Sequence, residues 1–152
     1  MLLSLFTFNL PTAPNANHDP SVKFIDASKC TKRTSIGGNE LANSIVGGSG
    51  NDFINTGYGA DTVLGGAGND TFIYRANEGT DRIMDYASGD MLKILKRNGK
   101  AGRFTSSKFD SGTLPLGISG GGNVIFENVM TSTTFNINNK SYKISGSRLV
   151  KK

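Results

Sequence analysis

Apolar and polar residues recur with a fixed nine-residue period from Gly47 to Ile73. The stretch reads GGSGNDFIN, TGYGADTVL and GGAGNDTFI, which are three units with no gap between them. A fixed short period is typical of a repeat architecture. In a three-residue strand the middle side chain lies on one face and its neighbours on the other. The pattern therefore predicts short strands joined by six-residue loops, with one inward row made by the eighth residues, Ile54, Val63 and Phe72.

The loops of these units carry a possible cation site. Glycine is common at the first, second and fourth places of the unit. It adopts positive φ readily and lets backbone carbonyls crowd a small space. The sixth place holds Asp52, Asp61 and Asp70. Calcium takes six to eight oxygen ligands from carboxylates and backbone carbonyls. A flexible glycine-rich linker is the alternative, but a linker has no reason to keep aspartate and apolar residues in fixed phase.

Imperfect units flank the three intact ones. Residues 38–46 fit the same period with Asn43 at the aspartate place, so a site shared by Asn43 and Asp61 is expected to be weaker or empty. After Ile73 the period slips by two residues and resumes at 76–84, with Asp81 at the sixth place. We expect Asp81 and Asp85 to share one face of an extended segment and to complete sites with Asp61 and Asp70, respectively.

These units resemble the RTX (haemolysin-type) calcium-binding repeat family, whose consensus is G-G-x-G-x-D-x-U-x. The segment DRIMDYASGDMLKIL, at residues 81–95, resembles the exit from such repeats. The resemblance implies an all-β fold in which two units make one turn of a short parallel β-roll. It also implies that Ca²⁺ lies between the loops of units i and i+2, which would pair Asp52 with Asp70. We expect about two to four ions, graded in strength. The expected ligands are carboxylate, amide and loop-carbonyl oxygens of Asp52, Asp61, Asp70, Asp81, Asp85, Asn43, Gly47, Ser49, Gly65 and Ala67.

The chain is expected to have three parts: an N-terminal strand and linker segment (1–35), the calcium-binding β-roll (36–95) and a C-terminal β-rich cap (96–152). Residues 1–10 are apolar but lack the basic start of a signal peptide, and residues 11–20 hold three of the four prolines, as a linker would. A strand is expected within 22–27. Residues 97–122 are predicted to be loop-rich. The pattern then predicts a strand at 123–130, a hairpin at 133–144 around an Asn-Asn turn, and a last strand near Leu149, together forming an antiparallel cap.

The charges are divided unevenly along the 152 residues, whose net charge is +5. Residues 37–90 hold eight acidic and two basic residues, whereas residues 91–152 hold two acidic and eleven basic ones. The acidic block is consistent with a cation site. The basic tail could suggest nucleic acid or an anionic surface, but its charges are interleaved with β-type residues, which favours a solvated face. No nucleic-acid partner is expected, and the single Cys30 forms no zinc-type cluster.

No catalytic motif is convincing in this sequence. Residues 117–121 match G-x-S-x-G, but that motif needs a strand–turn–helix context and a histidine partner. The single histidine, His18, lies in the proline-rich linker. The H-E-x-x-H motif and the phosphate-binding loop are both absent. We therefore expect that the chain is not an enzyme.

Two functional interpretations follow from the sequence. The first is a calcium-binding module that folds on binding Ca²⁺ outside the cell, as a monomer or as part of a larger secreted or surface protein. The family resemblance implies export of the unfolded chain through a type I secretion apparatus, and the sequence contains no transmembrane run. The second interpretation is a metal-independent structural or adhesive β-solenoid that binds a surface polymer through its basic tail.

Overall fold

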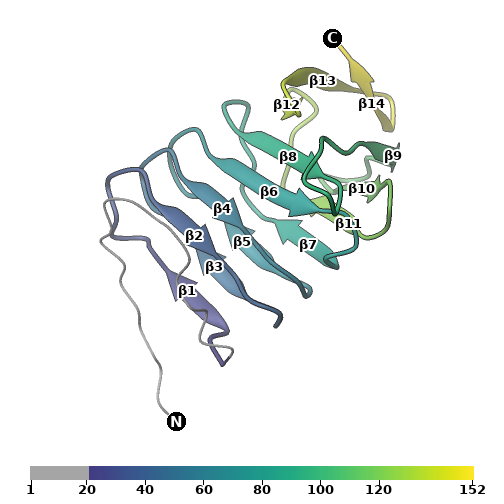
Figure 1. Cartoon of the computed structure of the whole chain (residues 1–152). Helices are drawn as coiled ribbons and strands as arrows, with labels where there is room; N and C mark the ends of the chain where they lie inside the picture. The colour runs from purple at the N-terminus through teal and green to yellow at the C-terminus, as the bar shows by residue number, and fades with distance from the viewer. Residues whose placement is uncertain (1–20) are drawn as a thin grey trace.

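The computed structural model describes residues 21–152, in which two β-sheets face each other across a narrow core (Figure 1). The expectations for residues 1–10 and 11–20 lie outside the described residues. Sheet A contains, in spatial order, β1 (Phe24–Asp26), β3 (Ser44–Val46), β5 (Thr62–Leu64), β7 (Thr80–Ile83), β11 (Asn123–Phe126), β10 (Leu114–Ile118) and β9 (Phe104–Ser107). Sheet B contains β14 (Arg148–Lys151), β13 (Lys140–Ser145), β12 (Thr134–Ile137), β8 (Met91–Leu95), β6 (Thr71–Arg75), β4 (Phe53–Asn55) and β2 (Ser35–Gly37).

The nine-residue units form a parallel β-roll with two units in each turn. Each strand pairs in parallel with the strand two units later, so Ile45 lies beside Val63 in sheet A. Later in the roll the offset grows to 20 residues, and Val63 lies beside Ile83. The two additional residues, Tyr74 and Arg75, lengthen β6 to five residues. The prediction of a two-residue slip after Ile73 is therefore confirmed.

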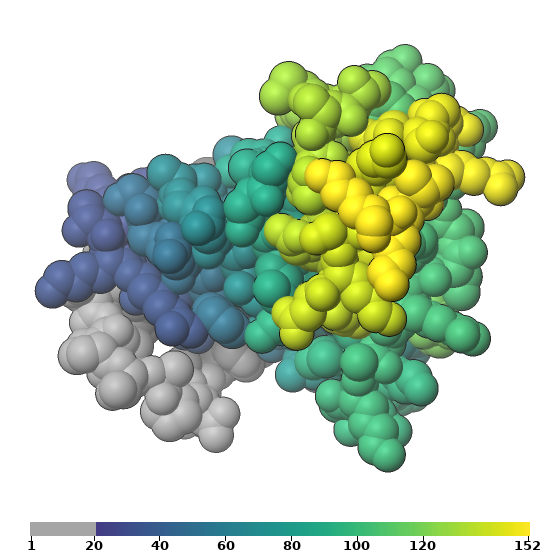
Figure 2. Space-filling view, turned by 90° about the horizontal axis from the view of Figure 1, so that it is seen from above, coloured from purple at the N-terminus to yellow at the C-terminus, as the bar shows by residue number. Residues whose placement is uncertain are grey.

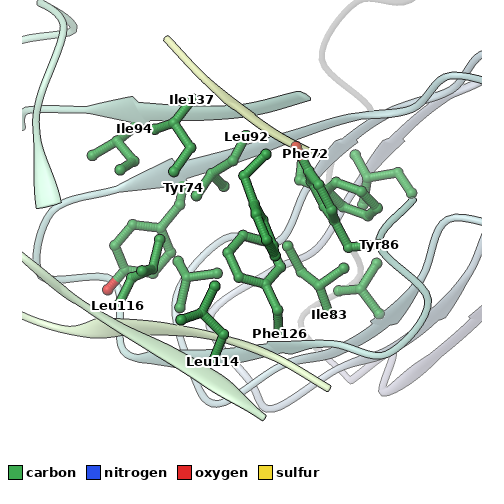
Figure 3. Packing of buried hydrophobic residues seen from close by; sticks show 14 of the residues in the cluster. Phe72, Tyr74, Ile83, Tyr86, Leu92, Ile94, Leu114, Leu116, Phe126 and Ile137 are labelled. Carbon is green, nitrogen blue, oxygen red and sulfur yellow. The ribbon is translucent and has the colours of Figure 1, made fainter. Parts of the chain in front are cut away.

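The core follows the predicted inward row. Ile45, Ile54 and Val63 are fully buried and Phe72 is 2% exposed. Towards the C-terminal end, aromatic rings widen the core (Figure 3). The Tyr86 ring stacks on Phe135, with centroids 5.3 Å apart, and packs edge-on against Phe126 at 4.7 Å. The narrow aliphatic roll thus continues into a broader aromatic core.

Glycine in the loops allows successive turns to stack closely. Gly66 and Gly68 have φ values of +91° and +117°, a region that other residues rarely adopt. A Cβ atom on Gly66 would lie 2.1 Å from the carbonyl oxygen of Gly48, in the loop of the previous turn. The glycines are therefore required both by backbone conformation and by contact between loops.

The C-terminal residues continue both sheets. β11 pairs in parallel with β7, and β12 with β8, before antiparallel strands complete each sheet. The strands predicted near 22–27, 123–130 and Leu149 are all present as β1, β11 and β14. The Asn-Asn turn is confirmed, since Asn138 and Asn139 both have positive φ between β12 and β13. Seen from above, the repeats and the C-terminal strands lie at opposite ends of an elongated molecule (Figure 2).

The prediction that residues 97–122 are loop-rich is wrong, because β9 and β10 lie there. Pro115 and Gly117 are unusual in strands, yet both occupy outward positions of β10, where they are half-buried. Leu114, Leu116 and Ile118 therefore still alternate inward as buried residues. The proposed boundaries at 35/36 and 95/96 remain predictions.

Removing the Phe126 ring should test the aromatic end of the core. Phe126→Ala deletes a fully buried ring that contacts Tyr86 and Phe135, so we expect a loss of about 3–5 kcal/mol in the free energy of unfolding. Urea denaturation at one fixed calcium concentration measures this loss. Phe24→Ala, at a phenylalanine that is 42% exposed, is the control. Equal losses in the two variants would contradict the assigned core.

Candidate metal centre

The sixth-place residues form two stacks, one at each loop edge of the roll. Consecutive units enter opposite sheets, so their aspartates alternate between the edges. We call the edge that precedes β4, β6 and β8 the β4 edge, and its stack consists of Asp52, Asp70 and Asp90. The edge that precedes β3, β5 and β7 is the β5 edge, with Asn43, Asp61 and Asp81. All six residues are buried.

At the β4 edge, each aspartate accepts a hydrogen bond from the backbone of the turn before it. The N–H of Asp52 donates to Asp70 Oδ1 at 2.8 Å, and the N–H of Asp70 donates to Asp90 Oδ1 at 2.9 Å. Asp85 lies in the same region, because its two oxygens accept bonds from the N–H groups of Gly65 and Gly66. Asp70 Oδ2 is buried without a hydrogen-bond partner.

Burial and like charges together disfavour ionisation at this edge. Burial is the main cause that raises the pKa of Asp70 to about 6, and the charges of Asp90, Asp52 and Asp85 add to the shift. Burial also raises the pKa of Asp90. The described residues contain two ion pairs, Arg75–Glu78 and Arg82–Glu127, and neither involves an aspartate of this edge. The edge therefore holds negative charge without a protein cation beside it.

The β5 edge has a different set of partners. The N–H of Asp61 donates to Asp81 Oδ1 at 3.2 Å, and the hydroxyl of Thr56 donates to Asp81 Oδ2 at 2.6 Å. Thr56 stands at the place where a repeat normally begins with glycine. Asn43 contributes a neutral amide whose oxygen accepts a bond from the N–H of Asn39. Asp61 Oδ2 remains buried without a partner.

Burial also dominates the electrostatics of the β5 edge. It raises the pKa of Asp81 to about 7 and that of Asp61 to about 6. Glu78 is buried nearby with a raised pKa, and its charge adds to both shifts. The Thr56 hydroxyl acts in the opposite direction, because it stabilises the charged form of Asp81. Thr56 thus supplies a side-chain donor to one carboxylate oxygen at this edge, in addition to the backbone donors.

The donor set at the β4 edge fits calcium. A Cβ atom on Gly65 would lie 2.5 Å from the unpartnered Asp70 Oδ2, and one on Gly47 would lie 2.2 Å from the carbonyl oxygen of Gly65. Glycine therefore leaves a space that carboxylate and carbonyl oxygens line, which are the hard ligands that Ca²⁺ prefers. Within residues 21–152, no group of three or more His, Cys, Asp or Glu side chains has the geometry of a metal cluster.

The structure sorts the predicted ligands into two groups. Asp52, Asp70 and Asp85 lie at the β4 edge with the loop residues Gly47, Ser49, Gly65 and Ala67, whereas Asn43, Asp61 and Asp81 lie at the β5 edge. The expectation that Asp81 and Asp85 share one face is wrong. β7 ends at Ile83, and the chain turns before Asp85 reaches Gly65 and Gly66.

Sequence reasoning missed three residues of these edges: Asp90, Glu78 and Thr56. Asp90 is not among the ligands expected from the sequence, but it lies in register after Asp70. The sequence spacing could have identified Asp90, because the 20-residue offset that relates Asp61 to Asp81 also relates Asp70 to Asp90. The hydroxyl bond of Thr56 had no comparable signal, because the repeat pattern only marks Thr56 as a departure from glycine.

Ser119 lies in a different setting from the one its motif requires. It follows β10 in a turn that leads directly into β11, so the context is strand–turn–strand. Its N–H donates to the carbonyl of Arg103. The candidate partner His18 lies outside the described residues.

A parallel β-roll with stacked aspartates at its loop edges is the arrangement that a calcium-binding nonapeptide repeat would form. Residues 37–72 match the model of the RTX calcium-binding nonapeptide repeat in four copies. This match includes the imperfect unit that carries Asn43. The matched repeat is described as a calcium-binding one.

Comparisons with whole proteins give weaker likenesses. The extracellular lipase LipA from Serratia marcescens is 19% identical, with a TM-score of 0.44, over 64% of this chain and 18% of the lipase. The AlgE6R3 subunit of the Azotobacter vinelandii mannuronan C5-epimerase is 24% identical, with a TM-score of 0.27, over 76% of this chain and 78% of that subunit. No curated protein matches the chain.

Acidification should stabilise the calcium-free protein. The folded-state pKa values of Asp61, Asp70 and Asp81 lie above the ordinary value of 3.8. The folded state therefore binds more protons than the unfolded state, and this stabilisation is lost as pH rises through about 6 to 7. Circular dichroism and urea denaturation in chelator should show more stable β structure at about pH 5 than at about pH 7.5. A D61N, D70N, D81N variant should lose most of this difference, and an unchanged pH dependence in that variant would contradict the assignment.

Removing the Thr56 hydroxyl should weaken the β5 edge. Thr56→Val keeps the side-chain shape but leaves Asp81 Oδ2 buried without its donor. We expect a loss of about 1–3 kcal/mol in the free energy of unfolding, measured with urea at fixed calcium. The control is Thr62→Val, at an outward strand position, which should change stability by no more than about 0.5 kcal/mol. Equal effects of the two substitutions would count against the role of Thr56.

Proposed function

We propose that this chain is a module that folds on binding Ca²⁺ outside the cell. The observation that carries the proposal is the β4 edge, where Asp52, Asp70, Asp85 and Asp90 gather without a protein cation. Asp70 contributes most directly, because its Oδ2 is buried and unpartnered beside the space left by Gly65. The repeat match over residues 37–72 supports calcium as the ion.

The residues that would hold the ion are the β4-edge carboxylates and the loop carbonyls of Gly47, Ser49, Gly65 and Ala67. Bound calcium would supply the positive charge that these carboxylates lack. At Asp70 the backbone bond from the neighbouring turn fixes Oδ1 and leaves Oδ2 available for a ligand. The second oxygens of Asp52 and Asp90 already accept N–H groups of their own loops, from Gly48 and Ala87. We propose that the β4 edge binds calcium more strongly than the β5 edge, where Asn43 is neutral and Thr56 occupies one oxygen of Asp81.

The energetics explain why such a module would respond to its compartment. A ligand that binds only the folded state stabilises it by RT ln(1 + [L]/Kd). Extracellular calcium sites have Kd values of about 10⁻⁴–10⁻³ M, far above cytosolic free calcium. The ordering of glycine-rich loops costs conformational entropy, and the clustered carboxylates repel one another. The chain would therefore remain largely unfolded in the cytosol and fold at millimolar calcium.

Secretion is part of the same proposal. A chain that stays unfolded inside the cell suits export through a type I secretion apparatus, with folding after release. We propose that it acts as a module of a larger secreted or surface protein, without catalytic activity of its own. No helix in residues 21–152 is long and apolar enough to span a membrane.

Calcium should produce most of the β structure at neutral pH. We expect circular dichroism to show a gain of β structure on adding millimolar calcium, with magnesium much less effective because its smaller shell demands rigid geometry. Asp52→Ala combined with Asp70→Ala should shift the calcium midpoint at least roughly ten-fold higher, which equals about 1.4 kcal/mol. Glu40→Ala, at an exposed acid in the first unit, should leave the midpoint unchanged.

The same experiment separates the two functional interpretations. A metal-independent solenoid would show identical spectra and melting temperatures in chelator and in calcium. That result, or an unaltered calcium midpoint in the double variant, would overturn the proposal.

A further inference from the structure

The outward side of sheet B carries positive charge without any acidic residue. The seven strands of this sheet contain no Asp or Glu. Their outward positions include Arg75, Lys93, Lys143 and Arg148, and Lys152 follows β14 on the same side, where its Nζ donates to Thr134 Oγ1. Residue pairs across these strands fix the sides, since directly opposite residues point the same way. We call this surface the basic face.

Most cations of the basic face have no acidic partner. Among residues 21–152 the two ion pairs are those of Arg75 and Arg82, so Lys93, Lys143, Arg148 and Lys152 lack one within this range. Lys93 Nζ instead lies 5.1 Å from the centroid of the Phe53 ring, and the Arg33 guanidinium lies 4.5 Å from the same centroid. Exposed cations without partners are available to a negatively charged ligand.

Sheet A provides the contrast within the same molecule. Its strands hold a single basic residue, Arg82, which is paired with Glu127, and two acidic residues, Asp26 and Asp81. The strands of sheet B therefore carry more unpaired positive charge than those of sheet A. The basic tail of the sequence did not predict the basic face, because two residues of that face, Arg75 and Phe53, come from the acidic repeat block.

The basic face also has a regular spacing. In-register residues cross the sheet from β2 to β13 as one row of Ser35, Phe53, Thr71, Met91, Asn136 and Ser141. Neighbouring strands lie about 4.8 Å apart, which is close to the length of one pyranose ring in an extended polysaccharide. Ser35, Thr71 and Ser141 in this row supply hydroxyl groups that can bond to sugar hydroxyls, while Met91 can pack against the apolar sides of the rings.

We propose that the basic face binds an extended anionic polysaccharide that runs across the strands of sheet B. Its acidic groups would pair with Lys93, Lys143 and Arg148, and its rings would lie along the row of hydroxyl side chains. Single-stranded nucleic acid fits less well, because sites for it use several aromatic platforms. Phe53 is the one aromatic residue at an outward position of these strands, and two cations already cover it.

The test uses dextran sulfate as the probe and the full chain in millimolar calcium, with uncharged dextran as the matched ligand. We expect dextran sulfate to bind with an affinity that falls as salt rises, and dextran to bind much more weakly. Lys93→Gln, Lys143→Gln and Arg148→Gln together should weaken binding roughly ten-fold. The control removes the same charge from the exposed β8–β9 loop, through Lys96→Gln, Arg97→Gln and Lys100→Gln, and should have a clearly smaller effect.

Several outcomes would overturn the proposal. These are failure of wild type to bind dextran sulfate, equal losses in the two triple variants, or tighter binding to an anionic lipid vesicle or a single-stranded oligonucleotide. Circular dichroism and calcium titration of each variant show whether it folds and responds to the ion. The calcium titration and the binding assay therefore test the two proposals separately. Either proposal can fail while the other stands.

Discussion

The stacking of carboxylates at the loop edges is the constraint on which the rest of the structure depends. A parallel roll repeats every two units, so any side chain at a fixed place meets its own equivalent in the next turn. Asp52, Asp70 and Asp90 are held in this way by backbone hydrogen bonds between turns. The fold that buries Ile54 and Phe72 therefore also brings like charges together. Apolar packing and electrostatic repulsion have the same geometric origin here, which makes a bound cation a natural part of the folded state.

The two edges resolve this conflict differently. At the β4 edge, Asp70 Oδ2 remains buried and unpartnered, and glycine keeps the neighbouring space open. At the β5 edge, a protein hydroxyl from Thr56 satisfies Asp81 Oδ2, and Asn43 replaces a charge with an amide. A protein donor needs no free calcium to act, whereas a metal contributes only above its Kd. Asp81 is therefore held by protein donors alone, whereas Asp61 Oδ2 at the same edge remains without a partner, like Asp70 Oδ2 at the β4 edge.

Much of this fold could be predicted from the sequence, because the repeat period carries both the strand spacing and the inward row. The period predicted the buried residues Ile54, Val63 and Phe72, and its interruption predicted the slip of two residues after Ile73. Prediction failed where local composition and tertiary packing disagree. Pro115 and Gly117 are poor strand residues in isolation, yet neighbouring strands hold β10 in place. Asp85 was expected to share a face with Asp81, but the chain turns after β7 ends at Ile83, and the repeat period does not encode this turn.

The positions of the charges in the folded molecule also could not be predicted from the sequence, and these positions affect the proposed binding of an anion. Sequence counts separate an acidic repeat block from a basic tail, but the folded molecule separates buried acids at the edges from exposed cations on the basic face. Asp52, Asp70 and Asp90 directly precede Phe53, Thr71 and Met91, which lie in the row across that face. Electrostatic interactions in physiological salt extend about 8 Å, so the edge charges act on the nearest part of the face. A cation bound at the β4 edge would cancel that negative field, and the same ion that favours folding would then also make the basic face more attractive to an anion.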